Sequence, residues 1–350
     1  MGKYFAVIDP GSKSITAVAA KWNKTSDYIL EGFCRVGSRG FHKGLVTDSA
    51  MAADSVSAVL KKLREKTGRR IHDVYAGISS TSVKVIRSSG VLLLSKYGRE
   101  IHCGDIERCV HIGSTIKLPL DKEPLHRSVE GFSIDGEREI KNPLNLEGVK
   151  LGVRVNILTI NSTVLRNMSR CISQAGFIPS GFVFSGLASA QRVLTGEKKD
   201  EGVILLDISE DITEVMVFYR GVLNSCMVLP LGAVDISQER RNIETAVLDK
   251  LVSQLDSLPG KERIRKAVVI GEGLLVDNLI DSLERIFSVP VSAGTCIVRP
   301  FEELPPERAG YICSLGILDH LQHERQKQRR NGNVLKRVFD RGREFIDRYF

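Results

Sequence analysis

Two strand-turn-strand units of the same pattern occur about 200 residues apart in this sequence. Each unit holds an apolar strand, a polar turn and a second apolar strand: Tyr4–Ile8, Asp9–Ser14 and Ile15–Ala20 in the first, and Val203–Asp207, Ile208–Asp211 and Ile212–Phe218 in the second. In both units an aspartate closes the first strand, and Ile-Thr-x-Val follows five or six residues later. The duplication predicts a chain built from two related lobes. Chance similarity between two hairpins is the alternative interpretation.

The length and composition are those of a folded chain with two parts. Its 350 residues are about twice the ~150 of a typical domain, and 42% hydrophobic and 26% charged residues are typical of a globular protein.

No stretch approaches the ~18 to 20 apolar residues of a spanning helix, and the first residues do not form a secretion signal. The seven cysteines include no Cys-x-x-Cys pair and the histidines show no metal-ligand spacing, so we expect a cytoplasmic protein without a metal site.

The net charge of +8 is concentrated at the carboxyl end of the chain. Residues 321–350 hold nine basic and four acidic residues, a net of +5, whereas the other 320 residues carry only +3. A nearly neutral body does not favour a broad nucleic-acid-binding face. The basic tail instead predicts contact with an anionic surface.

The hydrophobic pattern places further elements between and after the two units. It predicts a helix over 49–67, a strand over 74–78, two short strands within 83–94 separated at Ser88-Ser89-Gly90, a helix near 106–112, and helices near 165–175 and 187–194. After the second unit it predicts a long helix over 236–255, a strand over 267–270, a turn at 271–273, a helix over 275–286 and a last helix over 309–321. Residues 83–160 change to short strands and turns, which indicates a small α+β insertion.

The first turn has the composition of a phosphate-binding turn. In Asp9-Pro-Gly-Ser-Lys-Ser, the glycine permits close approach, the serines can donate hydrogen bonds, and the aspartate can lie near a metal ion bound to phosphate. An ordinary polar hairpin has the same residues, and this alternative stays open.

The order of these motifs resembles that of the actin-like ATPase superfamily, and within it the bacterial cell-division family FtsA. The matching stretches are Gly40–Val46, Thr67–Ser79, Glu100–Ile106, Phe132–Gly136, Asn142–Leu151, Ala175–Gly176, Leu187–Ala190 and Leu229–Gly232. The resemblance implies an α/β, actin-like (ribonuclease H-like) two-lobed fold with an inserted α+β subdomain and a C-terminal amphipathic helix. The implied parts are 1–82 and 161–199 for the first lobe, 83–160 for the insertion, 200–306 for the second lobe with a reduced subdomain at 233–267, 307–321 for a closing helix, 322–333 for a linker and 334–350 for the amphipathic helix.

The resemblance also implies an ATP and magnesium site between the lobes. Its residues here would be Asp9, Gly11, Ser12, Lys13, Asp207, Thr213, Gly271 and Gly273. Where the family has Asp-Ile-Gly-Gly-Gly-Thr-Thr-Asp, this chain has Asp207-Ile-Ser-Glu-Asp-Ile-Thr-Glu214. The family's adenosine-binding turn is Gly-Gly-Gly, and the corresponding turn here is Gly271-Glu272-Gly273. Carboxylates repel phosphates and side chains block the close approach that glycine allows. We therefore expect weak or absent ATP binding and at most weak ATPase activity, unless a metal ion bridges Glu210 and Asp211 to phosphate.

A second departure from the family lies between Gly232 and Gly271, where only 38 residues remain. The family carries in this place a subdomain that caps the nucleotide and receives the tail of FtsZ. One helix with a short return fits this length, so we expect FtsZ binding and polymerisation by the family's surfaces to be reduced. Self-association stays possible.

The last segment has the pattern of an amphipathic membrane helix. Apolar side chains recur at helical spacing on one side, with basic side chains beside them: Val334, Leu335, Lys336, Arg337, Val338, Phe339, Arg341, Phe345, Ile346, Arg348, Tyr349 and Phe350. A basic helix with aromatic residues on its apolar face binds the interface of an anionic bilayer. Docking on the body of the protein or in a partner's groove is the alternative.

Together these features predict an FtsA-like adaptor that tethers the FtsZ ring and other division proteins to the cytoplasmic face of the membrane at the division site. A PilM-like adaptor of pilus or secretion machinery is one alternative. An ATPase or small-molecule kinase with the same fold is another, and the crowded turn at Ser209–Asp211 argues against it. No nucleic-acid partner is expected.

Overall fold

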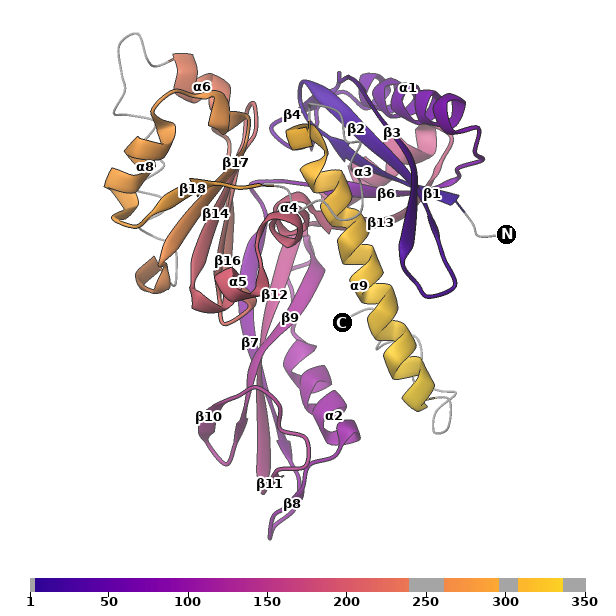
Figure 1. The fold of residues 1–350 in the computed structure, drawn as a ribbon. Helices are drawn as coiled ribbons and strands as arrows, with labels where there is room; N and C mark the ends of the chain where they lie inside the picture. The colour runs from indigo at the N-terminus through magenta and orange to yellow at the C-terminus, as the bar shows by residue number, and fades with distance from the viewer. Residues whose placement is uncertain (1–3, 239–260, 296–307, 336–350) are drawn as a thin grey trace.

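The computed structural model describes residues 4–238, 261–295 and 308–335. Two α/β lobes lie side by side, and a smaller unit of strands and one helix projects below them in the view of Figure 1. The two predicted lobes and the predicted α+β insertion are therefore all present.

The first lobe is a five-stranded sheet with helices on both faces. Its spatial order is β13-β6-β1-β2-β3, with β1 Tyr4–Pro10, β2 Ser14–Trp22, β3 Tyr28–Gly37, β6 Asp73–Ile78 and β13 Ile178–Phe184. Alternate residues of β1 face opposite sides: Ala6 and Ile8 pack with α1 (Ser49–Thr67) and α3 (Ser162–Gln174). Phe5 and Val7 pack with α4 (Ser185–Val193) and α9 (Ile312–Leu335). Because both faces are covered, the strand is apolar without alternation.

Helix α1 begins and ends where the sequence predicts. Asp48 caps its first turn by accepting a hydrogen bond from the Met51 N–H at 2.9 Å. Gly68 ends it in the left-handed conformation, at φ 65°, which costs glycine little. Beyond the helix's amino end, the short strands β4 (Phe41–His42) and β5 (Leu45–Val46) form a hairpin.

The second lobe repeats the pattern around a second five-stranded sheet. Its order is β16-β15-β14-β17-β18, with β14 Val203–Ile208, β15 Thr213–Tyr219, β16 Val222–Leu229, β17 Lys266–Gly271 and β18 Val291–Ala293. One face packs against α6 (Ala233–Gln238) and α8 (Leu279–Phe287). On the other face, Leu205 and Met216 belong to the same buried cluster as the first lobe, so the two lobes share core.

The insertion is a four-stranded antiparallel sheet covered by one helix. Its order is β10-β9-β12-β7, with β7 Lys84–Leu93, β9 Lys122–Ile134, β10 Glu137–Ile140 and β12 Lys150–Asn161, and the helix is α2 (Cys103–Ser114). A small pair, β8 (Arg99–Glu100) with β11 (Glu147–Gly148), closes its tip.

The expectation of two short strands within 83–94 is wrong, because β7 is continuous. Its Gly90 does not break the strand but lets α2 approach: a Cβ there would lie 2.4 Å from the backbone nitrogen of Gly113. A glycine that marks close packing was therefore misread as a turn.

The expected linker over 322–333 is also wrong, since α9 continues as helix from Ile312 to Leu335. Polar contacts hold residues 322–326 of this part against the first lobe. The side-chain amides of Gln322 and Gln326 donate to Asp27 at 2.9 and 3.0 Å, and the Arg325 guanidinium lies 4.9 Å from the ring centre of Trp22. A search for apolar stripes misses a helix that is held by polar contacts.

Some predictions fall on residues outside the described ranges. Of the long helix expected over 236–255, the structure describes only α6, because residues 239–260 lie outside. The amphipathic segment from Lys336 to Phe350 lies outside as well. Helix α5 (Gly196–Glu201) and three short 3-10 helices complete the described elements; the 3-10 helices are Lys261–Arg263, Glu272–Leu275 (η3) and Arg308–Tyr311. Within the described residues, no helix has the length and apolar character needed to cross a membrane.

Candidate functional site

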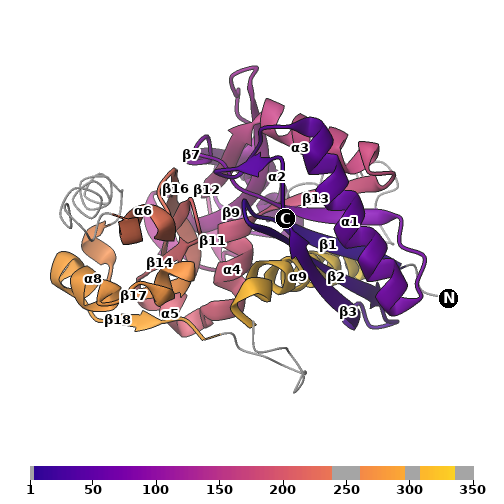
Figure 2. The same ribbon diagram turned by 90° about the horizontal axis from the view of Figure 1, so that it is seen from above.

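The turns of the two repeated units face each other between the lobes. The β1–β2 turn comes from the first lobe and the β14–β15 turn from the second, and α4 and α9 run between the lobes in both ribbon views (Figures 1 and 2). The antiparallel pairing of β1 with β2 and of β14 with β15 places Asp9 and Asp207 at the turn ends of their strands. The charge of Asp9 acts on Asp207, and Ser12 of the first turn contacts Asp211 of the second, so the two turns meet. We call the region between the two turns the cleft and the carboxyl groups buried beneath it its floor.

Three carboxylates lie at the floor of this cleft: Asp9, Asp207 and Glu214. Desolvation is the main cause that raises the pKa of each. The pKa of Asp207 rises to about 6, with the charge of Asp9 contributing. The pKa of Glu214 lies well above its usual range because of burial and then the charge of Asp207. Like charges in a desolvated site disfavour ionisation, so this floor tends to hold protons.

The partners of these carboxyl groups are hydroxyls and a thiol. Ser185 Oγ donates to Asp9 at 3.4 Å. The hydroxyls of Ser189 and Ser79 lie near Asp207 and Glu214 and offset part of the upward pKa shifts, but neither hydroxyl makes a hydrogen bond of normal geometry. Burial and the charge of Asp9 raise the pKa of the Cys313 thiol of α9 well above its usual range. Neutral donors stabilise a carboxylate less than a cation does.

Asp211, in the β14–β15 turn, binds the first lobe across the cleft. Its Oδ2 atom accepts hydrogen bonds from Ser12 Oγ at 2.5 Å and from the Lys43 backbone N–H at 2.8 Å. His42 Nδ1 lies 3.1 Å from the same oxygen. A phosphate bound at Ser12 would have to displace this carboxylate.

The β4–β5 hairpin that supplies two of these contacts has an unusual backbone. Lys43 and Gly44 both have positive φ, 48° and 74°, as the central residues of a type I′ turn require. Gly44 also packs closely, since a Cβ there would lie 2.8 Å from the Ser79 carbonyl oxygen. Lys43 makes a second contact with the other lobe, because its Nζ donates to the Pro230 carbonyl at 3.0 Å.

Some of the remaining predicted site residues lie beside the cleft, and others pack within the second lobe. Gly271, at φ 86°, approaches the end of β14 so closely that a Cβ would lie 2.9 Å from Asp207 Oδ1, and Gly273 packs on the Ile208 side chain. Thr213 is fully buried and its hydroxyl donates to the Leu231 carbonyl at 2.7 Å. Lys13 is exposed in the first turn.

Gly11 completes the predicted set. It closes the first turn, with its N–H donating to the Ser14 carbonyl at 3.0 Å. Sequence reasoning missed three contributors: His42, Lys43 and the buried Glu214. For Glu214 a signal exists, because it is an acid within an otherwise apolar strand. Nothing in the sequence indicates that the 41–46 hairpin faces the second turn.

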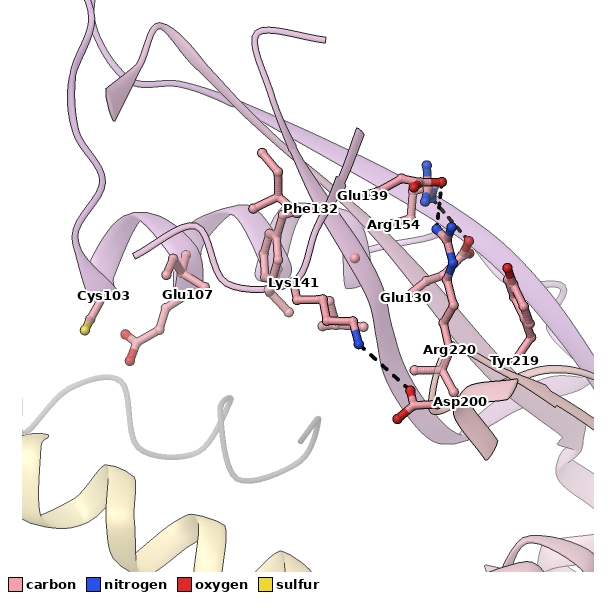
Figure 3. Close-up of a pocket in the computed structure, with 16 residues that line it drawn as sticks. Cys103, Glu107, Glu130, Phe132, Glu139, Lys141, Arg154, Asp200, Tyr219 and Arg220 are labelled. Atoms are coloured by element: carbon pink, nitrogen blue, oxygen red, sulfur yellow. Dashed lines mark ion pairs between the residues drawn. The ribbon is translucent and has the colours of Figure 1, made fainter. Parts of the chain in front are cut away.

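A pocket of about 850 Å³ lies between the insertion and the second lobe (Figure 3). Ile106, Val110 and Phe132 belong to its apolar lining. Two ion pairs join the two units at its edge: Glu139 to Arg220 at 2.7 Å and Lys141 to Asp200 at 4.0 Å. Both members of the first pair have positive φ, 76° and 55°. The sequence did not predict this pocket.

Comparisons with known proteins agree with this architecture. The family model described as "SHS2 domain inserted in FTSA" matches residues 80–159, which is the insertion. The chain is 31% identical to cell division protein FtsA of Borreliella burgdorferi over 85% of this chain and 67% of that protein. It is 26% identical to the FtsA proteins of Pseudomonas aeruginosa, over 68% of this chain and 57% of the relative, and of Bacillus subtilis, over 67% and 53%.

Solved structures share the fold at low identity. A chain of the PilM-PilN type IV pilus biogenesis complex superimposes with a TM-score of 0.60 at 14% identity, covering 91% of this chain and 98% of that one. MreB5 of Spiroplasma citri bound to ADP superimposes with a TM-score of 0.51 at 9% identity, covering 94% of this chain and 99% of the MreB5 chain.

The two lobes and these structural neighbours define an actin-like fold with an inserted subdomain. The identity and coverage of the relatives narrow the class further. The chain belongs to the FtsA family of cell division proteins. It spans 67% of the Borreliella protein and little more than half of the Pseudomonas and Bacillus proteins.

Proposed function

We propose that this protein is an adaptor of the cell division machinery, acting on the cytoplasmic side of the membrane at the division site. Family membership carries this proposal: 31% identity to an FtsA protein over 85% of the chain, together with the inserted domain that the family model describes. Imaging of a fluorescent fusion tests it. Rings at midcell support the division role, whereas polar or scattered foci refute it.

We propose further that nucleotide binding is weak or lost and that the protein acts by binding rather than catalysis. The arrangement at Asp211 supports this, because the Ser12 hydroxyl and the Lys43 N–H already donate to its carboxylate. Titration of the full chain with a fluorescent ATP analogue and magnesium measures it. A micromolar dissociation constant would contradict the proposal and would favour the ATPase or kinase alternative.

The basic amphipathic segment 334–350 is proposed to bind an anionic bilayer. Its sequence pattern is the support, with five basic and three acidic side chains mixed with apolar ones. A single copy would bind reversibly, and clustered copies would bind firmly. Co-sedimentation with liposomes that contain anionic lipid, comparing the full chain with a chain that ends at residue 333, tests the segment. Neutral liposomes are the control, and equal pelleting of the two chains on anionic liposomes rules out the anchor.

FtsZ and other division proteins are the proposed partners, and self-association is proposed as well. A PilM-like role in a pilus or secretion system is the second candidate, and the TM-score of 0.60 with the PilM-PilN structure favours it at the level of fold. Binding assays with purified FtsZ and with the cognate pilus proteins separate the two. Binding to pilus proteins alone would replace the division proposal.

A further inference from the structure

The carboxylate of Asp211 occupies the place where the first lobe offers donors to an anion. Three atoms of the first lobe surround one carboxylate oxygen: Ser12 Oγ, the Lys43 backbone nitrogen and His42 Nδ1, at 2.5, 2.8 and 3.1 Å. The Asp211 side chain is 15% exposed, so these bonds are largely shielded from water. Two hydrogen-bond donors aimed at one oxygen, with an imidazole nitrogen beside them, suit an oxyanion.

The turn that carries Asp211 is held in place from behind. The Ser209 N–H donates to the Ile212 carbonyl at 2.9 Å and the Ala233 N–H to the Ser209 carbonyl at 2.8 Å. Gly232 packs against the peptide unit, since a Cβ there would lie 2.3 Å from the Asp211 backbone nitrogen. Asp211 therefore projects from a rigid support.

The opposing hairpin is likewise shaped for this contact. Lys43 holds a left-handed conformation, at φ 48°, which is unfavourable for a residue with a Cβ atom. In this conformation its N–H points at Asp211 and its Nζ reaches the Pro230 carbonyl. Both contacts cross from the first lobe to the second.

We propose that Asp211 is an internal anionic ligand, which fills an anion site of the first lobe and holds the two lobes together without a nucleotide. This inference deepens the proposed loss of nucleotide binding, on which it rests. A ligand with phosphate groups would compete with Asp211 for the same donors. Asp211 thus determines the specificity of the cleft by occupying it.

Hydrogen–deuterium exchange of the Lys43 amide in the full chain tests the inference. Asp211→Ala removes the acceptor, and we expect the Lys43 amide to exchange at least tenfold faster than in the wild type. Glu210→Ala is the matched control, because it removes the same charge from the neighbouring position of the same turn, and it should leave the exchange rate unchanged. The amide of Val153, in the centre of β12, reports whether each variant is folded.

A second measurement examines the anion site directly. In Asp211→Ala, excess tripolyphosphate should slow exchange of the Lys43 amide again, and in the wild type it should have no effect. Unchanged exchange in Asp211→Ala, equal acceleration by Glu210→Ala, or no response of Asp211→Ala to tripolyphosphate would each overturn the inference. Micromolar ATP binding by the wild type would instead overturn the proposed loss of nucleotide binding, while the exchange rates without nucleotide still decide whether Asp211 joins the lobes.

Discussion

Replacing Asp207 with asparagine tests the cost of gathering carboxyl groups at the floor of the cleft. Burial, with the charge of Asp9, raises the pKa of Asp207 from 3.8 to about 6. In the unfolded chain the group returns to its ordinary pKa. Between about pH 4 and 6 the folded protein therefore keeps a proton that the unfolded chain has lost.

The sign and size of the effect follow from this difference. Because the folded state binds more protons, the stability of the wild type falls as the pH rises through this window, and the loss persists above pH 6. Each pKa unit corresponds to about 1.4 kcal/mol, so the loss is at most about 3 kcal/mol. Partial access of solvent to Asp207 reduces it. The asparagine side chain does not titrate, so the variant does not lose this stability as the pH rises.

Urea unfolding of the wild type and of Asp207→Asn, at pH 4 and at pH 7.5, measures the effect. The free energy of unfolding of the variant relative to the wild type should rise by about 2 to 3 kcal/mol between the two pH values. Removing the Asp207 charge also lowers the pKa of Glu214, which changes the comparison in the same direction. Carboxyl groups remote from the two titrate alike in both proteins and cancel. A difference that does not change with pH would refute the reasoning, because it would mean that Asp207 titrates alike in both states.

Three further substitutions test separate contacts. Asp105→Asn should lower the free energy of unfolding by about 1 to 3 kcal/mol at pH 7 and by less at pH 3. The hydrogen bond from Arg99 holds the pKa of Asp105 well below its ordinary 3.8. The stabilisation by the Asp105 carboxylate is therefore complete above pH 3.8 and is lost as the pH falls below that value. Urea unfolding at both pH values checks this, and an equal loss at both contradicts it. Gly232→Ala should lower the free energy of unfolding by about 1 to 3 kcal/mol, because the added methyl group overpacks against the Asp211 turn. Gly37→Ala is the control and should change it little, because a Cβ there meets nothing within 4 Å. Equal melting temperatures of the two variants would show that the turn moves to accommodate the methyl group. Gly90→Ala should push α2 away from β7 and destabilise the insertion, with Gly104→Ala of the same helix as control because a Cβ there meets nothing within 4 Å; exchange of β7 and β12 amides measures the change, and unaltered exchange would contradict it.

The sequence predicted the elements whose hydrophobic pattern is local. The strands at Tyr4–Pro10 and Val203–Ile208 and the helix at Ser49–Thr67 follow from runs, spacing and caps within a few residues. β7 was mispredicted because Gly90 serves a contact with Gly113, a residue distant in the chain. Sequence patterns do not contain such contacts.

The predicted residues of the cleft likewise come from local patterns, and the residues that were not predicted depend on contacts between distant parts of the chain. The aspartates and glycines of the cleft follow from two related turns, and their meeting follows from pairing of the strands. The role of Asp211 was anticipated only as repulsion of phosphate or, together with Glu210, as the ligand of a metal ion that bridges to phosphate. Its bond to Lys43 joins residues 168 positions apart and depends on a hairpin that the sequence did not predict.

The continuous helix α9 has a mechanical consequence. It begins at the floor of the cleft, where Ser314 Oγ lies 2.8 Å from Thr16 Oγ1, and its 24 residues span about 36 Å at 1.5 Å per residue. A flexible tether would let the body swing freely about its point of attachment. A rod instead sets both a distance and a direction, so an object fastened beyond Leu335 would be oriented by the cleft as well as carried by it.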